Sequence, residues 1–260
     1  MKRVFLVRYG SCSVEFCHQQ LHSGPIVIIP RKFSVVINQI IDLWVPPILR
    51  ESWLFRAPAR FFYRNAPIQI DKLKEHAFEM SDAELRLFYE ETTLFVHQGE
   101  TDLSPKSAQG VLNSITEGPV LEVGCGHGWL AQQMSKKFNV VATDFSLYGS
   151  YVSLTHSGFL AVESDIMSLP FSDNSFPTVV CTHTLEHVPD FQSALAELRR
   201  VCSGKLVVVV PRQRPYNVTF NPHVHFFPYR WSLLAYTGAK QLESLELVGG
   251  DWLFIESMTK

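Results

Sequence analysis

The feature that most constrains this chain is a strand, turn and helix sequence at residues 119–131. An apolar run predicts a short buried strand, and glycines follow it at three alternate positions, Gly124, Gly126 and Gly128. Glycine allows positive φ angles and lets a ligand approach the backbone closely. A helix opens at about Trp129, so its N-terminus faces the same turn. We therefore expect a site for a nucleotide or a nucleoside-like cofactor here.

The spacing around this turn narrows the kind of ligand. A dinucleotide fingerprint, G-x-G-x-x-G, would need its last glycine at position 129, where the chain has Trp129. NAD and FAD are therefore disfavoured. The next apolar strand, residues 140–144, ends in Asp144, sixteen residues after Gly128. A carboxylate there can accept both ribose hydroxyls of an adenosine group, which suits a cofactor without a 2′-phosphate.

Four motifs follow one another in the order and spacing of a known enzyme family. They are E-x-G-x-G-x-G from Glu122, T-D-x-S from Thr143, D-x-x-x-L-P-F-x-D-x-S-F from Asp165 and H-x-L-E-H-V-P-D from His183. On these motifs, residues 115–256 resemble the class I S-adenosylmethionine-dependent methyltransferases, in particular the type 11 group. The chain departs from the pattern at His127 and Trp129, which are bulky for the loop, and at Pro177, where the family usually carries an acid. None of these departures removes a cofactor contact.

The resemblance implies that S-adenosylmethionine is the cofactor, and it assigns the contacts. Asp144 would bind the ribose, Asp165 would accept a hydrogen bond from the adenine amine, and Glu122 would help to hold the loop and the methionine end. The predicted cofactor-binding set is Glu122, Gly124, Cys125, Gly126, Gly128, Asp144, Phe145, Asp165, Ile166, His183 and Thr184. Any one of these residues alone could be only a turn glycine or a helix cap, so the prediction rests on the whole set.

Histidines are the candidates for acid–base chemistry. Transfer of a methyl group from a sulfonium is an in-line displacement in which the enzyme mainly aligns the reactants, so few catalytic groups are required. An imidazole with a pKa near ~6.5 is matched to neutral pH. We take His223, His225 and His183 as the candidate catalytic residues, because each follows a predicted strand at the edge where open α/β folds bind substrates. We expect His187 to bond the backbone locally instead.

Strands and helices alternate from about residue 108 onward, which predicts an α/β fold. Strands are expected at 119–123, 139–144, 160–163, 177–182 and 204–210, with helices starting near 128, 146, 190 and 229. A short glycine turn at 249–251 joins two further strands as a hairpin. The expected fold is a doubly wound, mostly parallel seven-stranded Rossmann-like sheet that ends in an antiparallel hairpin. Residues 108–260 would form this domain, and residues 1–107 an N-terminal helical cap or substrate lid.

Charge is distributed unevenly along the 260 residues. The net charge is −2, but residues 1–70 hold nine basic and three acidic residues, a net of +6. That segment either covers the catalytic domain or meets an anionic or amphipathic partner. No apolar run approaches the ~20 residues that a membrane-spanning helix needs, although peripheral membrane contact stays open. Five cysteines, an odd number, suggest a reduced, cytoplasmic protein rather than a disulfide framework. No metal site is expected, because the spacing of Cys12, Cys17, His18 and His22 matches no zinc module.

The methyl acceptor is constrained partly by missing motifs. Cys181-Thr-His-Thr184 stands where enzymes that methylate nucleic-acid bases usually carry Asn/Asp-Pro-Pro-aromatic or Pro-Cys, so nucleic acid is disfavoured. We expect a small-molecule or lipid-like acceptor and O-methylation, with a substrate cap from residues 1–100 or from the segment 211–228. Arginines and aromatic residues in both places suit a flat or amphipathic acceptor that bears an acidic group. The alternatives are a protein or RNA methyltransferase that docks through the basic N-terminal region, and a cofactor-binding module without catalysis. The oligomeric state is left open by the sequence.

Overall fold

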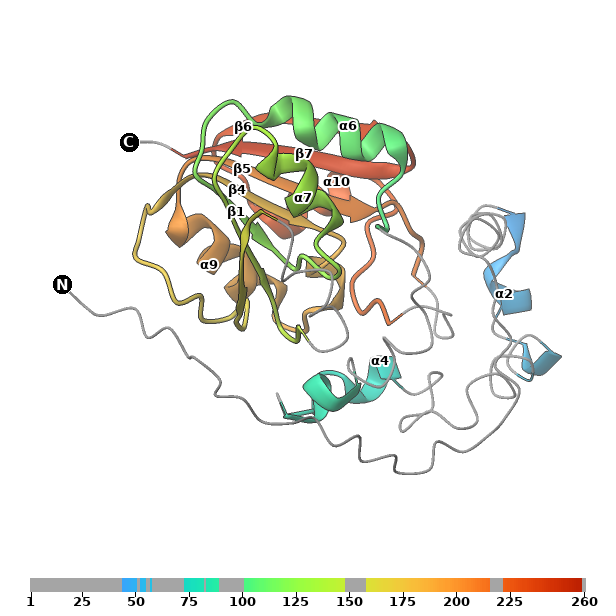
Figure 1. Cartoon of the computed structure of the whole chain (residues 1–260). Helices are drawn as coiled ribbons and strands as arrows, with labels where there is room; N and C mark the ends of the chain where they lie inside the picture. The colour runs from blue at the N-terminus through green and yellow to red at the C-terminus, as the bar shows by residue number, and fades with distance from the viewer. Residues whose placement is uncertain are drawn as a thin grey trace.

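Figure 1 shows the chain as a computed structural model, which describes residues 44–50, 52–54, 57, 73–81, 83–88, 101–147, 158–215 and 222–258. Within these residues, seven strands form one sheet in the order β3-β2-β1-β4-β5-β7-β6. The strands are β1 Val120–Val123, β2 Val140–Asp144, β3 Leu160–Glu163, β4 Phe176–Thr182, β5 Cys202–Pro211, β6 Leu242–Val248 and β7 Asp251–Ser257. Strands β1 to β5 pair in parallel, and β7 is antiparallel to both β5 and β6. The predicted Rossmann-like sheet with its terminal hairpin is confirmed.

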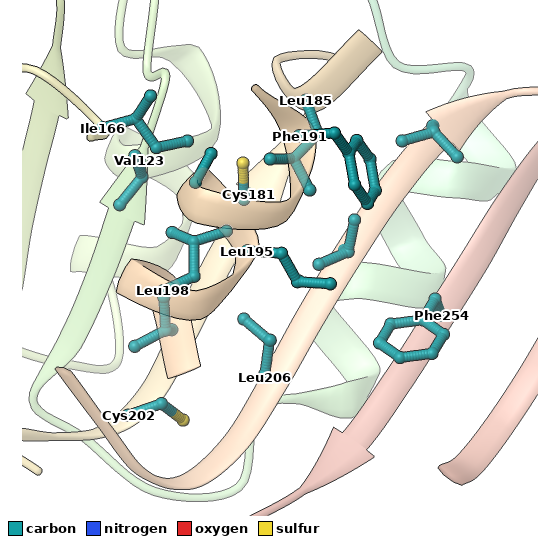
Figure 2. Close-up of a cluster of buried hydrophobic side chains, with 14 of the residues drawn as sticks. Val123, Ile166, Cys181, Leu185, Phe191, Leu195, Leu198, Cys202, Leu206 and Phe254 are labelled. Carbon is teal, nitrogen blue, oxygen red and sulfur yellow. The ribbon is translucent and has the colours of Figure 1, made fainter. Parts of the chain in front are cut away.

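Helices cover both faces of this sheet (Figure 1). Helices α6 (Pro105–Ser114) and α7 (Trp129–Ser135) contribute to one buried apolar cluster, and α9 (Phe191–Val201) contributes to another together with residues near α10 (Arg230–Thr237). Figure 2 shows part of the second cluster, where Leu195 and Leu198 of α9 lie beside Leu206 of β5. These three side chains are fully buried. The two clusters fix the sheet rigidly, so the positions of its strand ends are fixed as well.

Strand β5 begins two residues earlier than the sequence predicts. Gly204 was expected to start the strand, but β5 runs from Cys202, directly after the end of α9. The glycine is needed for a different reason: a Cβ atom at Gly204 would lie 2.6 Å from the carbonyl oxygen of Pro177 in β4. Close approach of two backbones, rather than a turn, therefore explains this glycine.

The final hairpin returns the chain to the carboxyl edge of the parallel strands. Its two turn residues, Gly249 and Gly250, have φ angles of 62° and 104°, which favours glycine at both positions. Strand β7 then starts at Asp251, which pairs with Pro211 at the end of β5. An acidic residue of the last strand is thereby brought to the edge where β1, β2, β4 and β5 end.

Two short segments from the N-terminal part pack near this edge. The predicted capping box is present: the backbone N–H of Ser81 donates to Glu84 Oε2 at 2.8 Å, and residues 83–88 are helical. Ala77 and Phe88 are buried in a small cluster with Met80 and Val224. Residues 73–88 therefore contact the segment that follows β5. Short helices α2 (Pro47–Arg50) and α4 (Leu73–His76) are also described.

Several sequence predictions lie outside the described residues. These are the continuation of the N-terminal helix to Val96, most of the helix expected from residue 146, and the cluster of Cys12, Cys17, His18 and His22. The expected boundary at residue 107 falls inside α6, and the division into cap and catalytic domain stays a prediction. Among the described helices, none has the length and apolar character needed to cross a membrane.

Candidate functional site

The glycine turn adopts the conformation that its composition predicts. Gly124, Gly126 and Gly128 have φ angles of 79°, 51° and 75°, all in the left-handed region that glycine tolerates best. The backbone N–H groups of Gly124 and Cys125 donate to the carbonyl oxygen of Thr143 at 2.8 and 2.9 Å, which anchors the turn to the end of β2. Gly128 caps α7, and the helix begins at Trp129 as expected.

The glycines differ in what surrounds them. A Cβ atom at Gly124 would lie 1.9 Å from Thr184 Oγ1, so this glycine makes room for the loop after β4. A Cβ atom at Gly126 would meet nothing within 4 Å. The backbone at Gly126 is thus exposed to open space, next to a packed wall formed by Thr184. That combination is a cradle into which a ligand can be placed against the backbone.

Asp144 closes the other side of this cradle. Its Oδ2 accepts a hydrogen bond from the backbone N–H of Gly126 at 2.7 Å, and its Oδ1 accepts one from Ser146 at 3.3 Å. Burial raises the pKa of this carboxyl group, and the hydrogen bonds from the backbone of Gly126 and Ser146 oppose the shift. A carboxylate has about four lone-pair sites, so Asp144 retains the capacity to accept hydroxyl donors.

Glu122 lies in β1 and Cys125 lies in the turn itself, and both residues are buried. Glu122 is 2% exposed, and its Oε2 atom has no hydrogen-bond partner. Burial, reinforced by the charge of Asp144, raises the pKa of Glu122 well above its usual range. Burial likewise raises the pKa of the Cys125 thiol. A buried carboxyl oxygen without a hydrogen-bond partner, next to the ligand cradle, is an atom to which a bound ligand can donate the missing hydrogen bond.

The residues expected at the adenosine end follow β2 and β3. Asp165 Oδ1 accepts from the backbone N–H of Met167 at 2.8 Å, and Ile166 is buried. Phe145 lies directly after Asp144 and is covered by the guanidinium group of Arg86, 4.4 Å from the ring centroid. Arg86 also pairs with Glu163 at the end of β3, at 2.5 Å. The helical residues 83–88 therefore reach this part of the edge.

The loop after β4 forms the second half of the edge. His183 has a φ angle of 50°, and its imidazole lies between two carboxyl groups. Its Nδ1 is 3.4 Å from Glu186 Oε1, and its Nε2 is 3.6 Å from Asp251 Oδ1. Burial alone would lower the pKa of His183, but Asp251 and Glu186 together raise it to about 10. At neutral pH this imidazole is therefore protonated and acts as a donor, not as a general base.

Glu186 is the centre of a buried polar cluster. It lies in the short 3-10 helix η1 (Leu185–His187), its side chain is fully buried, and neither carboxyl oxygen has a hydrogen-bond partner. The Nε2 atoms of His187 and His223 each lie 3.9 Å from Glu186 Oε1. Burial lowers the pKa of both imidazoles, that of His223 well below its usual range. Both rings are therefore neutral at pH 7.

The other nitrogen of each neutral imidazole is held by an oxygen. His187 Nδ1 donates to the carbonyl oxygen of Pro222 at 3.2 Å, a contact across 35 residues and not the local one that the sequence suggested. His223 Nδ1 donates to Gln213 Oε1 at 2.6 Å. His225 takes a different direction: its Nε2 donates to the carbonyl oxygens of Val188 and Pro189, at 2.9 and 3.1 Å. Of the three predicted catalytic histidines, His183 and His223 are brought together by Glu186, and His225 is not.

Sequence reasoning missed three members of this cluster, namely Glu186, Asp251 and Gln213. Glu186 stands inside a recognised motif, but its neighbours arrive from the segment after β5 and from the start of β7. The backbone carbonyl of Glu186 accepts hydrogen bonds from Val224 and His225, which docks that segment onto η1. Ser107 of α6 donates to Asp251 Oδ2 at 2.6 Å and fixes the acid beside His183. No local spacing in the chain signals these contacts.

Comparison with known proteins shows which family this part of the chain resembles. Residues 121–208 match the family model of a methyltransferase domain. This match supports the predicted resemblance to the class I S-adenosylmethionine-dependent methyltransferases. The predicted family is thereby confirmed, and the family and the fold together imply S-adenosylmethionine as the cofactor.

Individual relatives agree with this assignment. The chain is 33% identical over 119 residues to a demethylmenaquinone methyltransferase of Staphylococcus epidermidis, covering 42% of this chain and 49% of that protein. It is 30% identical over 100 residues to a ubiquinone biosynthesis O-methyltransferase of Pasteurella multocida, covering 32% and 41%. A Pyrococcus horikoshii protein of known crystal structure shares the fold with a TM-score of 0.52 at 18% identity, covering 65% and 99%. The first two matches span less than half of each curated relative's length.

The methyltransferase domain fits this cofactor in three respects. Gly126 leaves open space beside the turn, Asp144 offers carboxylate oxygens where ribose hydroxyls would lie, and Glu122 has an unpaired oxygen below. All three residues belong to the predicted cofactor-binding set. The structure brings the set together along the ends of β1, β2, β3 and β4, and its individual contacts remain predictions.

Proposed function

We propose that this protein transfers a methyl group from S-adenosylmethionine to a small-molecule or lipid-like acceptor, and that the acceptor atom is an oxygen. The names of the matched relatives support the class of acceptor, since two of them act in menaquinone and ubiquinone synthesis by name. The name of the second relative supports O-methylation.

One observation carries the proposal: the cofactor cradle and the buried polar cluster are joined by two consecutive residues. Thr184 packs against Gly124 in the cradle, while His183 reaches Glu186 and Asp251 in the cluster. When bound, the cofactor supplies an activated methyl group on a sulfonium. The chain holds an acceptor beside it, and alignment of this kind can lower the barrier by about 7–11 kcal/mol.

The polar cluster suits an acceptor that carries a hydroxyl group. The protonated His183 can donate a hydrogen bond to an acceptor oxygen, and the neutral His223 stays a candidate to receive a proton. Residues 73–88 contribute to the same site as a lid. Lys74 lies 4.4 Å from the Phe226 ring centroid, and the Phe78 ring lies edge-on to His225 at 6.2 Å.

The test has two arms. In a thermal shift experiment, S-adenosylhomocysteine should raise the melting temperature, whereas NAD and NADP should not, because only a ligand that binds the folded state stabilises it. A shift of equal size with NAD would contradict the cofactor assignment. In the second arm, tritium-labelled S-adenosylmethionine is incubated with matched hydroxylated and amine-bearing lipid-like acceptors. Labelling of the amines alone would contradict O-methylation.

A further inference from the structure

The strongest unexplained feature of the molecule is the carboxyl group of Glu186. A fully buried carboxyl group with no hydrogen-bond partner is costly unless something else balances it. Three imidazoles surround it: His183 Nδ1 lies 3.4 Å from Oε1 and forms an ion pair, and the Nε2 atoms of His187 and His223 each lie 3.9 Å away. His187 and His223 are each held through Nδ1, by Pro222 and Gln213, and each turns its Nε2 atom toward Glu186.

Three atoms of the types that bind metal ions therefore lie close together. They are Glu186 Oε1, His187 Nε2 and His223 Nε2, and all lie within 4.8 Å of one another. A carboxylate oxygen and imidazole nitrogens grouped in this way are the ligands that a transition-metal ion such as Zn²⁺ takes in proteins. We propose that Glu186, His187 and His223 bind one divalent transition-metal ion of the Zn²⁺ type.

The arrangement has the features of a metal site with an open position. Two imidazole nitrogens and one carboxylate form a common three-residue Zn²⁺ ligand set, which leaves a fourth position for water or a substrate oxygen. Metal-bound histidines nearly always donate their other N–H group to a carbonyl or carboxyl oxygen, and both histidines here do so. Ligand distances of about 2.0–2.2 Å place tetrahedral ligand atoms about 3.4 Å apart, so the two 3.9 Å separations from Glu186 Oε1 would shorten by about 0.5 Å on binding.

The surrounding charges agree with a bound cation. Glu186 and Asp251 place two carboxyl groups on either side of the His183 imidazole. The ammonium group of Lys74 lies over the Phe226 ring. The ion would also explain why the buried side chain of Gln213, which is 3% exposed, accepts a hydrogen bond from His223 and orients its ring.

The consequence for chemistry rests on the proposed function. An acceptor hydroxyl bound at the open position of a metal ion would have a lowered pKa, and its proton would pass to solvent water before methyl transfer. His223 would then be a ligand and not a general base. The metal site itself does not depend on this step and can be tested without turnover.

The experiment uses the full chain without a histidine tag, stripped of metal with a chelator and titrated with Zn²⁺ against a chromophoric competitor. We expect one Zn²⁺ per chain. His223→Gln and Glu186→Gln should each weaken binding at least about 100-fold, and Gln213→Ala about 10- to 100-fold, as for other residues that orient a ligand. His225→Gln is the matched control, because its ring lies in the same segment but bonds backbone carbonyls. It should keep the affinity within about 3-fold.

Two further readouts keep the test decisive. Circular dichroism must show that each variant is folded, and Co²⁺ in place of Zn²⁺ should give visible absorption bands that vanish in His187→Gln. Absence of stoichiometric Zn²⁺ binding, or equal losses in the His223 and His225 variants, would overturn the metal site. Titration of the same samples with S-adenosylhomocysteine separates this failure from that of the proposed function, because the cofactor cradle uses none of the three ligands.

Discussion

The two halves of the carboxyl edge are built in opposite ways. The half formed by β1, β2 and β3 uses backbone: the glycine turn, N–H groups that bond Thr143, and a strand-end acid, Asp144. The half formed by β4, β5 and β7 uses side chains gathered around Glu186, which come from the loop after β4, from the segment after β5 and from the start of β7. A backbone site suits a ligand that stays the same across a family. A side-chain site is changed by single substitutions, so it is the half that can differ between acceptors.

Substituting alanine for each of two glycines of the turn tests this difference most directly. Gly124→Ala places a Cβ atom 1.9 Å from Thr184 Oγ1 at a φ angle of 79°, so it should cost at least about 2 kcal/mol of folding free energy and most cofactor binding. The melting temperature should fall by about 4–8 °C.

Gly126→Ala is the matched control, with a φ angle of 51° and nothing within 4 Å of its Cβ. It should cost only about 1–2 kcal/mol of stability, from the left-handed backbone. Its affinity for S-adenosylhomocysteine should nevertheless fall by at least about 10-fold, if the ligand occupies the open space. Calorimetric titration measures this loss, and unchanged affinity would mean that the cradle is not where the cofactor lies.

Asp144→Ala should have a smaller effect on the fold and a large one on the ligand. Each charge-assisted hydrogen bond to the ribose is worth about 1.5–3 kcal/mol, so affinity for S-adenosylhomocysteine should fall roughly 10-fold or more. The matched variant is Asp173→Ala, an acid whose side chain pairs with Arg200 away from the cradle. Equal affinity in the Asp144 and Asp173 variants would remove Asp144 from the site.

Arg86→Ala should give the smallest effect and would test the lid. Its ion pair with Glu163 and its contact with Phe145 are partly exposed and worth about 0.5–1 kcal/mol each. We expect S-adenosylhomocysteine to dissociate about 2- to 10-fold faster, measured by stopped flow. Lys205→Ala breaks a comparable ion pair, to Glu243, and should leave the rate unchanged. Identical rates in both variants would mean that residues 83–88 do not cover the cofactor.

The contrast between the halves also decides what the sequence could predict. Strand periods, glycines and caps are local, so the sheet, the hairpin and the turn at Gly124 were predicted within a few residues. Gly204 shows the limit of that reasoning, because its reason is a backbone in another strand.

The polar cluster could not be predicted, since its members are assembled only by the fold. His187 and His223 are 36 residues apart, and Asp251 arrives from a strand that reverses direction. For this reason the metal ligands proposed here were not recognised by spacing. The cluster of ligand-type residues considered from the sequence, Cys12 to His22, lies outside the described residues.

The position of Asp251 has a consequence for how the protein is made. The backbone-built half and His183 are encoded first, and Asp251 can meet His183 only after β7 has left the ribosome and paired with β5. Until then His183 has a single carboxyl neighbour, Glu186. During synthesis the glycine turn and Asp144 are therefore complete before the environment of His183 is.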